Sequence, residues 1–267
     1  MTRILALLRK ELVDIRGNRS LFMPALISGA FSLLLPFFVA VLVPALSGER
    51  LSDSIDFRVA LELYRAQPIT TALEPEAAIQ AWLFQQFLVL LAFTPITAAM
   101  SVAAYAVIGE KQARTLEPLL ATPISTVELI AAKVLGAFLP SLVLAVGCYL
   151  VYLALIVMLA LPGVWTVLLL PRSLATMFVL APLATLAALQ LAVCVSSRVN
   201  DARSAQQIGA LIILPLSGLM VAQLMGGVQL TAGVLAWIAL GLGLFNVGLM
   251  RLAVVLFDRE SILTRWT

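Results

Sequence analysis

The chain has 267 residues, of which 62% are hydrophobic and only 12% are charged, and its formal net charge is +3. A soluble domain is closer to half apolar and a quarter charged, so this composition excludes a large soluble domain and indicates an integral membrane protein. The sequence has no histidine, and none of its lysines follows a glycine, so it lacks both a histidine metal motif and a P-loop. We therefore expect no enzyme activity from the chain alone, and neither a metal nor a cofactor bound to it.

The first segment, residues 1–20, precedes the apolar runs and predicts an amphipathic helix over 2–18. The side chains on its apolar face are Ile4, Leu5, Leu8, Leu12 and Ile15, and those on its polar side are Arg9, Lys10, Asp14 and Arg16. A helix with this pattern so close to a membrane span is expected to lie in the membrane interface.

Six apolar runs follow, each near or above the roughly 20 residues that cross a bilayer. They cover residues 21–46, 81–108, 128–161, 174–195, 207–225 and 232–256. Two longer polar segments separate them, 47–80 and 109–127. The sequence therefore predicts an all-α integral membrane protein with six transmembrane helices and a single transmembrane domain over 1–267.

The basic residues predict an orientation for these spans. If the N-terminus is inside, the internal segments hold 13 of the 17 lysines and arginines and the external segments hold four. Because short cytoplasmic loops are enriched in lysine and arginine, we expect a multi-pass protein with both termini in the cytoplasm. Segment 47–80 is then external and 109–127 cytoplasmic. This placement also explains the net positive charge without a nucleic-acid partner. Lys133, near the cytoplasmic end of its span, is expected to snorkel toward the interface.

The cytoplasmic segment between the second and third spans contains a short amphipathic pattern, GEKQARTLEPLLATPIS over 109–125. Thr115 can cap a helix whose first turn holds Pro118, where the missing N–H costs little. The residues spaced for one apolar face are Leu116, Leu119 and Leu120, and the charged residues around them are Glu110, Lys111, Arg114 and Glu117. Thr122-Pro123 ends the segment, and Ser125 with Glu128 forms a predicted capping box for the next helix. We therefore expect a small helix at the membrane surface with a leucine face that needs a partner.

This loop resembles the cytoplasmic loop of the ABC-2-type permeases, the membrane subunits of many ABC exporters. The matching positions are Glu110-Lys111, Thr115-Leu116-Glu117, Leu119-Leu120 and Thr122-Pro123-Ile124-Ser125. Gln112 and Arg114 depart from the pattern, where Glu and Gly are frequent.

The resemblance implies a permease subunit of an ATP-driven exporter in the inner or plasma membrane. It implies pairing with a second copy or a close paralogue, and with separate ATPase subunits that carry ATP and Mg. The coupling helix would contact those ATPases through Glu110, Lys111, Arg114, Thr115, Leu116, Glu117, Leu119, Leu120 and Pro123.

Two interpretations stay open at this level. Apart from Glu128 at the very start of the third run, the spans contain no Asp or Glu, which argues against an ion-coupled carrier. They do contain other polar side chains, namely Gln85, Gln86, Thr94, Thr97, Ser101, Gln190, Gln223 and Asn246. These polar side chains either line a substrate path or form hydrogen bonds between helices. The alternative function is a membrane assembly or scaffold subunit that docks a cytoplasmic partner without transport.

Overall fold

The computed structural model describes residues 2–17, 23–53, 57, 73–112, 125–196, 199, 201–225 and 230–256, and this part of the chain contains no strand. The N-terminal helix is α1 (Thr2–Gly17). The helices of the spans are α2 (Met23–Phe37), η2 (Phe38–Leu42), α3 (Val43–Ser47), α5 (Pro75–Gln86), α6 (Leu88–Leu91), α7 (Phe93–Gln112), α9 (Thr126–Leu159), α10 (Pro171–Ala175), η6 (Thr176–Leu180), α11 (Ala181–Ser196), α12 (Ala202–Gly209), η7 (Ala210–Ile212), α13 (Ile213–Leu224) and α14 (Ala232–Leu256). Short turns η3 (Leu51–Asp53) and η5 (Val164–Leu169) lie between spans.

Six helical stretches are long and apolar enough to cross a membrane. They are Met23–Ser47, Pro75–Ala106, Thr126–Leu159, Pro171–Ser196, Arg203–Leu224 and Ala232–Leu256. The predicted all-α membrane fold with six spanning helices is confirmed. The second stretch begins before the apolar run at 81 because Pro75 occupies a first-turn position of α5, where its missing N–H costs no hydrogen bond.

The second span, which comprises α5, α6 and α7, lies at the centre of the bundle, and the other helices bury most of its side chains. Its helix is interrupted at Phe87 and Ala92. Pro95 contributes to the second interruption because it has no N–H to bond the carbonyl of Leu91.

Carbonyls near these interruptions receive hydrogen bonds from side chains of neighbouring spans. The Tyr152 hydroxyl of α9 donates to the carbonyl of Phe84 at 2.9 Å, and the Ser32 hydroxyl of α2 donates to the carbonyl of Leu90 at 3.0 Å. In a bilayer no water reaches such groups, so partners from adjacent helices are required. The irregular central span is therefore held by the first and third spans.

Polar contacts also fix the end of the bundle that carries α3. The Gln80 amide nitrogen donates to the carbonyl of Ala40 in the π-helical segment η2, and its amide oxygen accepts from the N–H of Leu161, both at 3.0 Å. The Glu76 carboxylate accepts from the N–H groups of Leu51 and Ser52, also at 3.0 Å. Three spans are thereby joined at this end.

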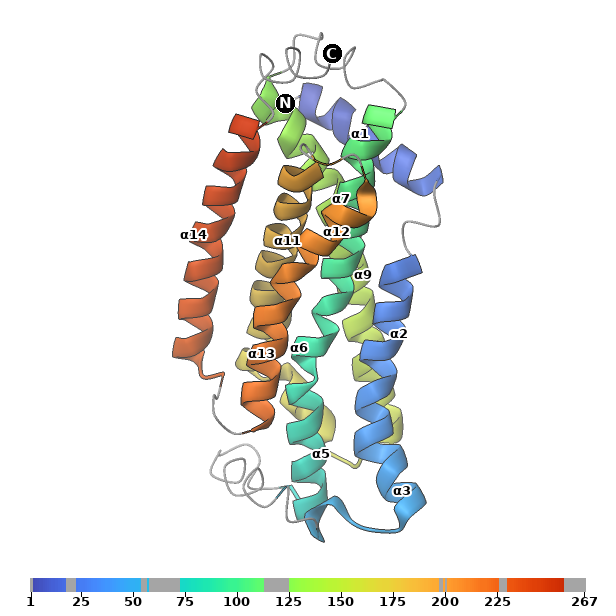
Figure 1. Ribbon diagram of the computed structural model, residues 1–267. Coiled ribbons are helices and arrows are strands. Elements are labelled where there is room, and N and C mark those ends of the chain that lie inside the picture. Colours follow the sequence, from blue (N-terminus) through green and yellow to red (C-terminus); the bar gives the residue numbers. More distant parts are fainter. Residues whose placement is uncertain are drawn as a thin grey trace.

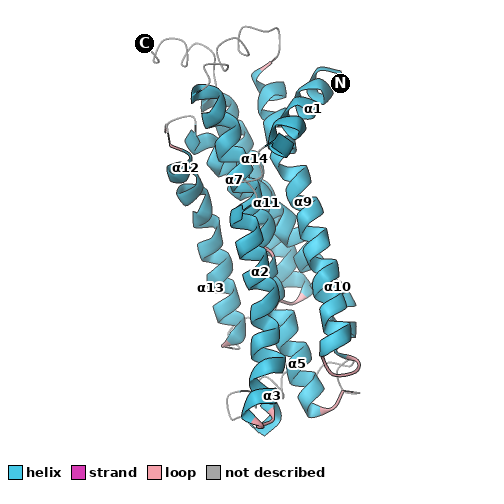
Figure 2. Cartoon of the chain, turned by 90° about the vertical axis from the view of Figure 1, so that its right-hand side faces the viewer, coloured by secondary structure: helices cyan, strands magenta, loops and turns pink. Residues whose placement is uncertain are grey.

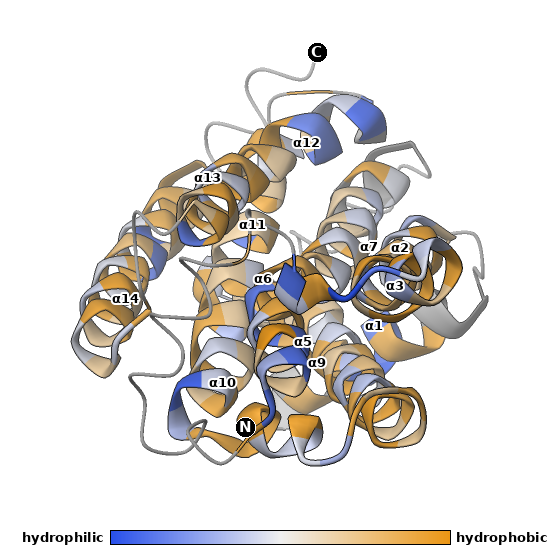
Figure 3. Cartoon of the chain, turned by 90° about the horizontal axis from the view of Figure 1, so that it is seen from below, coloured by the Kyte–Doolittle hydropathy of each residue, from blue (hydrophilic) through white to orange (hydrophobic). Residues whose placement is uncertain are grey.

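The other end of the bundle gathers α1, the end of α7, the start of α9, α12 and the end of α14 (Figures 1 and 2). Viewed from the α3 end, α13 and α14 form a flank of the bundle and are largely apolar (Figure 3). Exposed side chains on these two helices include Leu214, Val221, Trp237, Leu244 and Val255. This surface suits contact with membrane lipid.

Candidate coupling site

The predicted cytoplasmic loop is framed by two long helices. Its first arm is α7, which ends at Gln112, and its second arm is α9, which begins at Thr126. The Ser125 hydroxyl accepts from the N–H of Glu128 at 3.2 Å, while the Glu128 carboxylate accepts from the N–H of Ser125 at 2.9 Å. The predicted capping box is confirmed, and it fixes where the loop re-enters the bundle.

The loop itself falls largely outside the described residues. Glu110 and Lys111 belong to the last turn of α7. The other predicted coupling residues, Arg114, Thr115, Leu116, Glu117, Leu119, Leu120 and Pro123, lie outside the part of the chain that the structure describes. The leucine-faced coupling helix therefore stays a prediction, and the structure defines the base on which it stands.

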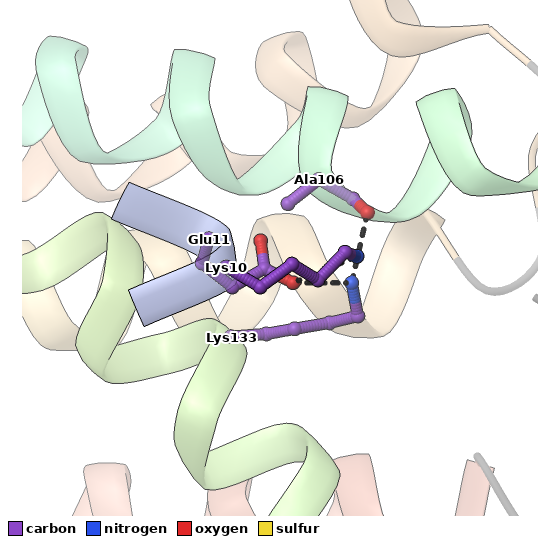
Figure 4. A network of polar contacts seen from close by, with 4 residues as sticks. All are labelled: Lys10, Glu11, Ala106 and Lys133. Carbon is purple, nitrogen blue, oxygen red and sulfur yellow. Dashed lines mark hydrogen bonds and ion pairs between the residues drawn. The ribbon is translucent and has the colours of Figure 1, made fainter. Parts of the chain in front are cut away.

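The base of the loop contains a buried cluster of charges. The Lys133 ammonium on α9 donates to the Glu11 carboxylate of α1 at 3.2 Å and to the carbonyl of Ala106 in α7 at 2.9 Å. Lys133 is 2% exposed and Glu11 is 5% exposed. Lys10 lies on the rim, with its ammonium 3.7 Å from the same Glu11 oxygen. Figure 4 shows the Lys133 amino group between Glu11 and Ala106.

The expectation that Lys133 snorkels is wrong. Its stem does not run to a polar interface, because α1 supplies a carboxylate at the depth where the ammonium lies. An ammonium inside a bundle is costly unless it is paired and hydrogen-bonded, and here both conditions are met.

The packed face of α1 also differs from the predicted one. Leu7 and Glu11 are buried against the bundle, whereas Leu5 is 61% exposed. This face can pack closely against α9 because residue 136 there is a glycine. An added Cβ at Gly136 would lie only 2.8 Å from the Cβ of Glu11. Periodicity alone missed Glu11, because a carboxylate counts as polar in any hydropathy pattern. The available signal was an acid one turn after Leu7, together with a lone lysine in the third span.

A second surface supports the first arm from the opposite direction. Ala104 and Ile108 of α7 pack against Ala205 of α12. Helix α12 also packs closely against α11. This approach requires glycine at position 209, where an added Cβ would lie 3.2 Å from the carbonyl oxygen of Ala188 in α11. The end of α7 is thus held between α12 and the pair α1 and α9.

The start of α12 carries a charged N-cap. The Asp201 carboxylate accepts from the N–H groups of Ser204 at 3.1 Å and Arg203 at 3.3 Å. These two backbone hydrogen bonds, with that of Ser204 the stronger, hold the pKa of Asp201 below its usual value. The cap is therefore ionised at neutral pH and satisfies N–H groups at the helix start.

The polar residues inside the spans are mostly covered by the chain itself. The Gln85 amide donates to Ser173 at 2.8 Å, and the Asn246 amide donates to the carbonyls of Leu183 at 3.0 Å and Leu242 at 2.8 Å. For Gln85 and Asn246 the structure confirms hydrogen bonding between helices. Buried oxygens of Gln86, Thr94, Gln190 and Gln223 have no hydrogen-bond partner among the described residues. Within the same residues, no three His, Cys, Asp or Glu side chains gather as a possible metal site.

Comparison with known families identifies the chain. The family model described as ABC-2 family transporter protein matches residues 58–265. The matched range begins before the second span and runs past the sixth, so it includes both arms of the loop. Comparisons with curated proteins and with solved structures give no significant match. Six membrane-spanning helices and a match over most of the sequence lead to one conclusion: the chain belongs to the ABC-2 family of transporter proteins.

Proposed function

We propose that this permease is the membrane subunit of an ATP-driven exporter, and that the loop between α7 and α9 docks separate ATPase subunits. The main support for the proposal is the packing at the base of the loop, where α1, α7, α9 and α12 meet at one end of the bundle. The chain that carries this loop is a member of the ABC-2 family. A second copy or a close paralogue would complete the translocation pathway. ATP and Mg would be bound by the ATPase partner.

The mechanism follows from the connection between the loop and the centre of the bundle. Closure of the ATPases on ATP would displace the coupling helix, and α7 and α9 would carry that displacement inward. Because α7 continues into the most buried span, a small shift at the loop reaches the interior directly. The interruptions at Phe87 and Ala92 are places where this span bends most readily.

The proposal is tested by isolating the ATPase partner and by measuring ATP hydrolysis with and without the permease. Affinity purification of the tagged chain from native membranes should recover a protein that has a P-loop and lacks apolar spans, as identified by mass spectrometry. The two proteins together should hydrolyse ATP in proteoliposomes, and the chain alone should not. Hydrolysis by the chain alone, abolished by a substitution within it, would refute the proposal. A stable complex without nucleotide-dependent transport of any tested substrate would favour a scaffold role.

The proposed orientation has its own test. In a background without Cys148 and Cys194, Ser204→Cys and Ser261→Cys should react with an impermeant thiol reagent only after the membrane is opened. Ser54→Cys and Ala66→Cys should react in intact cells. The reason is the concentration of lysine and arginine in the segments assigned to the cytoplasm. Labelling at position 204 from the outside of intact cells contradicts the six-span orientation.

A further inference from the structure

We infer that Lys133 is a positioning residue that locks α1 to both arms of the loop, so that α1 and the arms move as one unit during coupling. This inference rests on the proposed function, because it assigns α1 a part in the same transmission. It concerns how the base of the loop keeps its geometry and needs no contact between Lys133 and nucleotide or substrate.

The position of the contact supports this role. Lys133 lies seven residues into α9 and Ala106 lies six residues before the end of α7, so each is roughly 10 Å along its helix from the loop. The ammonium bonds to the Ala106 carbonyl and the Glu11 carboxylate together. One side chain thus connects three helices at a single depth below the loop.

Helix α1 packs closely against α9 at this point. Glycine at 136 lies one turn after Lys133, and the Glu11 Cβ occupies the space that a side chain there would need. Direct contact between α1 and α9 therefore places the Glu11 carboxylate beside the Lys133 ammonium. Leu8 lies at the edge of the same contact, within 4.0 Å of that space.

Stability alone is a weak reason for such a pair. Taking two charges out of water costs several kcal/mol each, and apolar side chains of similar volume at such sites are often equally stabilising. Apolar packing would hold α1 on α9, but it would leave the Ala106 carbonyl without the donor that links α7 to the same point. The ammonium supplies a directional bond, which packing does not.

The deciding variants separate charge, packing and the bond to Ala106. The double variant Glu11→Met, Lys133→Met removes both charges while it keeps side-chain length, so it should still insert and fold. The exchanged variant Glu11→Lys, Lys133→Glu restores an ion pair but places an acceptor opposite the Ala106 carbonyl. Lys10→Met is the matched control, because it removes an exposed ammonium near the same carboxylate.

The first measurement uses the chain alone. Spin labels at Val13→Cys on α1 and Tyr105→Cys on α7, with Cys148 and Cys194 replaced, report the distance between these helices by pulsed electron paramagnetic resonance. Both labelled positions are exposed. The native pair and Lys10→Met should give one narrow distance distribution, and the double and exchanged variants should both broaden it. A native distribution in either of these two variants overturns the inference.

The second measurement uses the complex with the copurified ATPase. The double variant should retain the ATPase at the native level, while stimulation of ATP hydrolysis by the permease falls about fivefold or more, the lower range of coupling between distant sites. Native stimulation in the double variant overturns the inference. If the native chain recruits no ATPase at all, the proposed function fails instead, and the spin-label distances still decide whether Lys133 locks the three helices.

Discussion

Replacing Gly136 with leucine is expected to destabilise the chain by about 3 kcal/mol, the upper part of the range for overpacked interiors. Even the first added carbon would lie 2.8 Å from the Cβ of Glu11 and 3.4 Å from its Cγ. The first of these atoms is attached to the helix backbone and has no rotamer that avoids the clash. The substitution therefore pushes α1 away from α9 and separates Glu11 from Lys133. Thermal unfolding of the detergent-purified chain and hydrogen exchange of the α1 amides measure the loss.

The same helix offers a matched control. Gly147 has open space around its position, because outside its own stretch of helix no atom of the described residues lies within 4 Å of an added Cβ. Gly147→Leu should therefore leave both the melting temperature and the exchange of α1 unchanged, since the new side chain points away from the rest of the bundle. Equal effects at the two glycines would show that α1 is not seated where the structure places it.

The spans were predictable because a bilayer imposes a simple demand on composition and length. Any helix that crosses hydrocarbon needs about 20 apolar residues, so Ala232–Leu256 and its counterparts are visible in the sequence. The interruptions within the second span were less visible. Pro95 marks one of them. No residue of this kind marks the break at Phe87, and the hydroxyl that bonds the nearby carbonyl of Phe84 belongs to Tyr152, which is far away in sequence.

The base of the coupling site was predictable only where its contacts are local. The capping box of Ser125 and Glu128 spans three residues, and its sequence pattern indicates it directly. The pairing of Glu11 with Lys133 joins residues 122 positions apart, and no periodicity links them. The hydropathy pattern predicted that the Lys133 ammonium would extend toward water, whereas in the fold it is buried against the Glu11 carboxylate.

Replacing Leu119 with aspartate is expected to weaken binding of the ATPase strongly while the permease still inserts into the membrane. Leu116, Leu119 and Leu120 share the apolar face of the predicted coupling helix. If an ATPase groove covers this face, the substitution buries an unpaired carboxylate in that groove. The expected loss is about 2–4 kcal/mol of association, or roughly 30- to 1,000-fold in Kd. The spans are unchanged, so insertion and thermal stability should remain native.

Two controls make this result specific. Leu119→Met preserves the size and apolar character of the side chain and should bind the ATPase normally. Ile55→Asp introduces the same charge in the segment between the first and second spans, on the face proposed to be external, and should also leave binding unchanged. A loss of binding in either control would point to a general defect in the chain.

The proposed function depends on whether the loop between α7 and α9 is the ATPase docking site. The most direct measurement is the Kd between the purified ATPase and the full-length permease in proteoliposomes, compared for the native chain, Leu119→Asp and Leu119→Met. Of the three chains, only Leu119→Asp is expected to lose binding, and ATP-driven transport should fall with it. Native binding and transport in Leu119→Asp would mean that the leucine face rests on lipid, and would contradict the assignment of this loop.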